Sequence, residues 1–119
     1  MLNLDTHILL YALSGALTAG EKKILSRELW GISSIVLWEI AKLHQKGRIT
    51  LSLDHPGWAS RLSQMEIWPI TREVCLAVSA LDFQGDPADE LIAATSVVYQ
   101  VPLVTRDRRI RTSRLIQIL

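Results

Sequence analysis

The sequence contains a single cysteine, Cys75, which excludes a disulfide framework and a thiolate-bound metal cluster. No apolar run reaches the ~18 residues that crossing a bilayer requires, and the N-terminus shows no basic leader followed by an apolar stretch. We therefore expect a soluble cytoplasmic protein with no membrane segment. The 13 basic and 12 acidic residues leave a net charge of only +1, so the total charge alone does not indicate a nucleic-acid partner.

The apolar content, 49% of 119 residues, is enough for one domain spanning 1–119 with its own core. Segments with the pattern of strands alternate with segments of helical pattern. The predicted strands are 1–5, 32–33, 66–70, 101–105 and 115–119, with a minor extended piece at 48–53. This alternation predicts an α/β sandwich with a parallel sheet, in which ligands bind beyond the carboxyl ends of the strands.

Capping residues set the expected ends of the early helices. Thr18 opens a capping box, and the helix that follows is expected to continue to about residue 30, where Gly31 would end it. Ser34 is expected to cap a helix over 35–46.

A later helix begins with three acids. Asp86 suits the N-cap, Pro87 the first helical position and Asp89 the third, near the positive end of the helix dipole. Capping alone explains two of the acids, and we interpret Asp86 as a cap rather than a metal ligand.

Four acids lie at the edges of apolar segments, where an isolated carboxylate would be costly. Asp5 and Asp107 each follow a predicted strand, and Glu39 and Asp89 lie early in helices that follow strands. All four can therefore converge on one rim of the sheet. Oxygen ligands favour hard cations, so the expected ion is Mg²⁺ or Mn²⁺. The three histidines and one cysteine offer no zinc-ligand spacing.

Four short motifs together resemble the PIN-domain ribonucleases, and most closely the VapC-like toxins of toxin–antitoxin pairs. The motifs are Leu4-Asp5-Thr6-His7; Ser33 with Leu37-Trp38-Glu39-Ile40-Ala41; Asp86-Pro87-Ala88-Asp89 followed by Leu91-Ile92-Ala93-Ala94; and Val104-Thr105-Arg106-Asp107. The resemblance covers nearly the whole chain. It implies a three-layer α/β/α sandwich with a central, mainly parallel sheet of four to five strands, in which the first and fourth main strands are neighbours.

The resemblance also implies a function. The acidic metal site falls on Asp5, Glu39, Asp89 and Asp107, with Thr6, Ser33 and Thr105 at supporting polar positions. The implied activity is an Mg²⁺- or Mn²⁺-dependent endoribonuclease that cleaves cellular RNA through a metal-activated water. A cognate antitoxin and a homodimer are the implied protein partners.

An arginine cluster follows the last motif, and its possible RNA-backbone contacts are Arg106, Arg108, Arg109 and Arg111. The same arginines could instead balance the acids or receive an acidic partner segment. The four tryptophans could stack on bases, but their spacing favours the core or a dimer surface.

Two departures from the family pattern leave an alternative open. Glu90 stands where many relatives carry Arg, and Val36 stands where they carry Ser or Thr. A PIN-like domain that has lost catalysis and only binds a partner is therefore the main alternative. A receiver-like Mg²⁺-binding signalling domain is less favoured, because Ile70-Thr71 and Thr105-Arg106 do not supply its phosphoacceptor Asp and its Lys.

Overall fold

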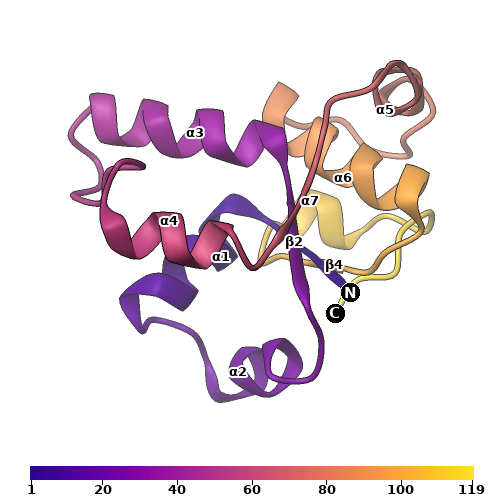
Figure 1. Ribbon diagram of the computed structural model, residues 1–119. Coiled ribbons are helices and arrows are strands. Elements are labelled where there is room, and N and C mark those ends of the chain that lie inside the picture. Colours follow the sequence, from indigo (N-terminus) through magenta and orange to yellow (C-terminus); the bar gives the residue numbers. More distant parts are fainter.

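A four-stranded parallel sheet forms the centre of the computed structural model, which describes residues 1–119 (Figure 1). The strands lie in the order β3-β2-β1-β4. Their bounds are β1 Leu2–Leu4, β2 Trp30–Ser33, β3 Glu66–Trp68 and β4 Leu103–Val104. Every pair is parallel, and the first and fourth strands are neighbours, which confirms the predicted sheet. The strand order reverses between β1 and β4, where α/β folds place ligands.

Seven helices connect and cover the strands. They are α1 Thr6–Ser14, α2 Ala19–Leu25, α3 Ser34–Gln45, α4 Pro56–Leu62, α5 Arg72–Val78, α6 Pro87–Tyr99 and α7 Arg108–Arg111. In the view of Figure 1, α3, α5 and α6 lie above the strands and α2 lies below them, giving the predicted α/β/α layers. None of the helices combines the length and the apolar character that a membrane span requires.

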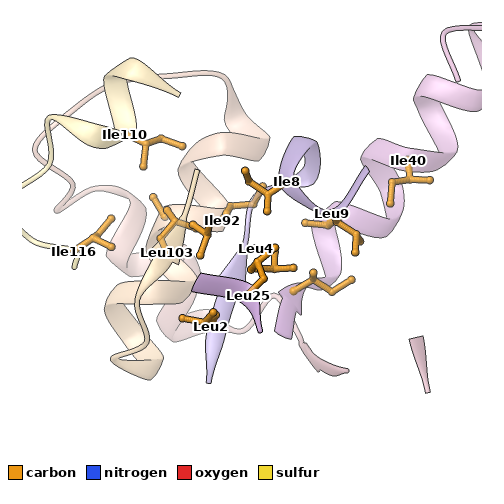
Figure 2. Close-up of a cluster of buried hydrophobic side chains, with 14 of the residues drawn as sticks. Leu2, Leu4, Ile8, Leu9, Leu25, Ile40, Ile92, Leu103, Ile110 and Ile116 are labelled. Carbon is orange, nitrogen blue, oxygen red and sulfur yellow. The ribbon is translucent and has the colours of Figure 1, made fainter. Parts of the chain in front are cut away.

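The core surrounds β1, which is buried on both faces, as expected for an inner strand of a parallel sheet. Figure 2 shows Leu2 and Leu4 of this strand among side chains from the helices and from β4, including Ile8, Ile92 and Leu103. Each such side chain contributes roughly 1.5–3 kcal/mol when it is fully buried. The apolar contacts therefore fix the helices over the middle strands.

One polar residue of β1 sets the position of α6. The Asn3 side chain is completely buried, and its Nδ2 donates to the carbonyl oxygen of Ile92 at 3.0 Å and to Oγ of Ser96 at 2.9 Å. Asp89 lies about one helical turn before Ile92. The bonds from Asn3 therefore hold the acidic start of α6 near the end of β1, where Asp5 follows.

The predicted end of α2 is wrong. The capping box of Thr18 and Glu21 is present, but the helix ends at Leu25, and Gly31 lies inside β2. A Cβ at Gly31 would meet the ring of Trp68 at 2.4 Å. This glycine is therefore needed for the close approach of Trp68 to the strand and does not end a helix.

Three smaller predictions also need correction. Ser33, not Ser34, caps α3, because its Oγ accepts from the backbone N–H of Ile35 at 3.3 Å. The extended piece expected at 48–53 forms no strand. The last strand expected at 115–119 is reduced to a single parallel bridge to β4.

Candidate active site

A cleft of about 350 Å³ lies at the carboxyl ends of β1 and β4. It is lined by Asp5, His7, Tyr11, Asp86, Asp89, Arg106 and Asp107. We call it the acidic cleft. It brings together three of the four acids predicted from the sequence, at the expected reversal of strand order.

Asp5 connects the ends of the two strands. It is the first residue after β1 and is only 3% exposed. Its Oδ1 accepts from the backbone N–H of Thr6 at 2.8 Å, and its Oδ2 accepts from Oγ1 of Thr105 at 2.6 Å. Burial raises the pKa of Asp5, while these hydrogen bonds oppose the rise. The Thr105 hydroxyl also accepts from the backbone N–H of Asp107 at 3.0 Å, so one threonine links both aspartates.

Glu39 approaches Asp5 from α3, although it does not line the acidic cleft. Its carboxylate accepts a hydrogen bond from the hydroxyl of Thr6, the residue that follows Asp5. Burial raises the pKa of Glu39, and the negative charge of Asp5 adds to the rise. The predicted supporting residue Ser33 caps α3 and bonds to none of the four acids.

Asp89 shows the strongest electrostatic effect in the cleft. It is the third residue of α6 and is half-buried. Burial raises its pKa to about 7, and the nearby carboxylates of Asp5 and Asp107 contribute to the rise. Glu39 and Asp86 add smaller effects of the same sign. Asp89 therefore responds to the charge of all the other acids around the cleft.

Asp107 and Asp86 both stand at helix N-caps but behave differently. Oδ1 of Asp107 accepts from the backbone N–H of Ile110 at 3.0 Å and so caps α7. Asp86 has the backbone conformation of the α6 cap, but its side chain makes no capping bond and lines the acidic cleft. The interpretation of Asp86 as a cap is therefore wrong for its side chain.

Neither Tyr11 nor His7 was among the site residues predicted from the sequence. Both residues lie on α1 and line the acidic cleft. Tyr11 lies one helical turn after His7, the last residue of the Asp5 motif, and this spacing was a usable signal because it places both on the same face of the helix.

The arginine cluster divides into two groups. Arg106 forms a two-point ion pair with Glu21, at 2.7 and 2.6 Å, and its guanidinium lies 4.1 Å from the ring centroid of Tyr11. Arg111 donates to the carbonyl oxygen of Thr105 at 2.9 Å. The side chains of Arg108 and Arg109 are exposed and form no ion pair. Only these last two are free for an external phosphate as the side chains stand.

The donor chemistry of the acidic cleft fits a hard divalent cation. Carboxylate oxygens are the ligands that Mg²⁺ and Mn²⁺ prefer, and a cation would relieve the repulsion that adds to burial in raising the pKa of Asp89. No three acidic, histidine or cysteine side chains are grouped tightly enough to hold one ion in their present rotamers. Binding an ion would therefore require the carboxylates to rotate toward one another.

Comparisons with known proteins agree with this architecture. The family model of the PIN domain matches residues 3–114. Ribonuclease VapC22 of Mycobacterium tuberculosis is 37% identical over 86 residues, which are 70% of this chain and span 66% of the length of that relative.

Solved structures show the same fold at low sequence identity. The VapBC2 complex from Rickettsia felis, bound to a promoter DNA fragment, matches at 22% identity with a TM-score of 0.72, covering 100% of this chain and 98% of that one. A toxin–antitoxin complex from Klebsiella pneumoniae matches at 19% identity with a TM-score of 0.74, covering 100% and 96%. FitAcB from Neisseria gonorrhoeae matches at 17% identity with a TM-score of 0.74, also covering 100% and 96%.

Replacing Asp89 with Asn should stabilise the metal-free protein at alkaline pH. The pKa of Asp89 is about 7 in the folded state and 3.8 as an isolated side chain, so the parent should lose stability as the pH rises between these values. We expect Asp89→Asn to exceed the parent by ~1–2 kcal/mol at pH 8, after discounting for solvent screening, and to match it below pH ~4. Urea unfolding in EDTA at several pH values measures the difference.

The matched control is Glu90→Gln, which removes a charge from the same turn of α6 but outside the lining of the acidic cleft. It should leave the pH dependence of the parent unchanged. If Asp89→Asn instead destabilises the protein and keeps the pH dependence of the parent, Asp89 stabilises the first turn of α6 and does not belong to a shared site.

Proposed function

The chain belongs to the PIN-domain family, and on that premise we propose that it is an Mg²⁺- or Mn²⁺-dependent endoribonuclease, the toxin of a toxin–antitoxin pair. The observation that carries the proposal is the acidic cleft, in which burial, together with the charges of the neighbouring carboxylates, raises the pKa of Asp89 to about 7. Such an arrangement weakens a metal-free protein and suits one that binds a divalent cation. The similarity to a protein named a ribonuclease supports RNA as the substrate.

In this proposal Asp5, Glu39, Asp89 and Asp107 hold the metal, and Asp86 adds negative charge at the edge of the cleft. A bound ion of this kind supplies an activated water and offsets the charge of a phosphate. The hydroxyls of Thr6 and Thr105 orient the carboxylates of Glu39 and Asp5. Hydrogen bonds of this kind orient metal ligands, and their loss typically lowers the affinity for the metal.

Arg108 and Arg109 are proposed to contact the RNA backbone. They follow Asp107 as the first two residues of α7 and are exposed, so they can approach phosphates that neighbour the reacting one. Arg106 and Arg111, which were included in the predicted set, already have partners within the chain. We assign them to holding the rim of the cleft.

Two protein partners complete the proposal. A cognate antitoxin is supported by the toxin–antitoxin complexes among the structural relatives. A homodimer is the second proposed partner, and the apolar side chains of Trp38 and Leu76, which are 55% and 59% exposed, are candidates for its surface. The molar mass in solution tests the dimer directly.

We place the activity in the cytoplasm, where a lone cysteine stays reduced.

The test of metal-dependent cleavage uses purified protein and RNA. Cleavage should require Mg²⁺ or Mn²⁺, stop in EDTA and return with excess Mg²⁺. Asp5→Asn should reduce the rate by more than the ~100-fold typical of losing a residue that only supports a metal ligand. Asp54→Asn, which changes an exposed aspartate outside the acidic cleft, is the matched control and should keep full activity.

Cleavage that continues in EDTA would contradict the metal requirement. A protein that binds Mg²⁺ but cleaves no RNA would instead be the partner-binding PIN domain suggested by Glu90 and Val36.

The arginine assignment predicts a specific change in RNA binding. Replacing both Arg108 and Arg109 with Ala should weaken binding and reduce the slope of log affinity against log salt by ~1.4, because each lost contact with single-stranded RNA changes the slope by ~0.7. Replacing the exposed Arg27 and Arg72 with Ala removes the same charge elsewhere and serves as the control. Equal salt slopes for these two double variants would contradict the RNA contact and indicate that Arg108 and Arg109 bind a protein partner instead.

A further inference from the structure

A second cleft, of about 500 Å³, adjoins the acidic cleft. It lies between α1, the end of α3 and residues 47–51, and we call it the side cleft. His7 and Tyr11 line both clefts. A ligand that reaches the carboxylates on one side of these two residues can therefore continue into the side cleft on the other.

The lining of the side cleft differs chemically from that of the acidic cleft. It contains no acidic residue, and half of the lining residues are hydrophobic, Leu43 and Leu51 among them. Arg48 supplies the one cationic side chain apart from the titratable His7, and Thr50 supplies a hydroxyl. Apolar walls with a few polar groups are typical of sites for small organic ligands, whose usual volume is ~300–1,000 Å³.

The wall between the clefts is aromatic, and its Tyr11 ring is held in place. The ring of Tyr11 is covered by the guanidinium of Arg106, which lines the acidic cleft but not the side cleft. Glu21 fixes that guanidinium by its two-point ion pair. The His7 ring lies next to Tyr11, with the ring centroids 6.3 Å apart. Rigid aromatic side chains beside a phosphate site are the usual platform for an unpaired base.

We propose that the side cleft binds one unpaired nucleobase of the RNA, that of the nucleotide adjoining the phosphate in the acidic cleft. A base has apolar faces and polar edges, which match the mixed lining. Arg48 can bind the phosphate of the same nucleotide. Because the side cleft contains no acids, the RNA is not repelled there as it is in the acidic cleft. This inference rests on the proposed ribonuclease function.

Nucleoside 5′-monophosphates test the site without any cleavage. In metal-free buffer they should shift the amide NMR signals of Ser14, Gly47 and Thr50, whereas inorganic phosphate and ribose 5-phosphate should leave Ser14 and Thr50 unshifted. The variant Thr50→Trp places a large side chain in the cleft lining and should weaken nucleotide binding by ~5-fold or more, the lower end of the range for stacking one base. Ser60→Trp makes a comparable change at an exposed position of α4 outside both clefts and should have no effect.

A second variant guards against misfolding of the first. Arg48→Ala keeps the cleft open and should weaken the binding of monophosphates but not that of the uncharged nucleosides. Absence of nucleotide shifts at these three amides in the parent protein would overturn the proposal.

An RNA with one abasic nucleotide beside its cleavage point links the cleft to the reaction. The missing base should raise KM for the parent by ~5-fold or more and have no further effect on Thr50→Trp. RNA cleavage that is insensitive to the abasic position would overturn the base site and leave the proposed function standing. Nucleotide binding without RNA cleavage would overturn the proposed function and leave the base site standing. If Thr50→Trp keeps nucleotide binding and loses only a co-expressed antitoxin, the cleft is a protein-docking groove and the proposal is wrong.

Discussion

Repulsion between carboxylates at the carboxyl ends of β1 and β4 is the constraint on which the candidate site depends. Asp5, Asp89 and Asp107 face one cleft, and burial removes much of the water that would screen their charges. The result is the elevated pKa of Asp89. Such a cluster does not stabilise the fold, because each carboxylate would cost less free energy if it were on the surface. A divalent cation is the simplest partner that turns the repulsion into attraction.

The fold holds these acids in place with the same bonds that begin its helices. Asp5 accepts from the first N–H of α1, and Asp107 caps α7. Thr105 joins the two aspartates, and Asn3 holds α6, on which Asp89 lines the same cleft. Except for Asn3 in the middle of β1, these positions are at the end of a strand or in the first turn of a helix. The site is therefore assembled by local chain geometry, and the buried core supplies the energy that keeps the carboxylates together.

Much of this arrangement was predictable from the sequence, because alternating patterns and strand-end acids are local signals. The parallel sheet and the shared rim of Asp5 and Asp107 followed from them, whereas the pairing of the first and fourth strands was implied only by the family resemblance. Features that depend on distant partners did not. Gly31 resembles a helix stop until Trp68 is known to lie against it. Arg106 resembled an RNA contact because its partner, Glu21, is 85 residues away in the chain.

The most direct test of the central claim is the number of protons released when Mg²⁺ binds, measured by calorimetry in buffers of different ionisation enthalpy. With the pKa of Asp89 at about 7, Mg²⁺ binding at pH 7 should release about half a proton, because a ligand carboxylate must ionise. The release should vanish near pH 9 and in the Asp89→Asn variant. Magnesium binding without proton release, or a release that survives Asp89→Asn unchanged, would contradict the account.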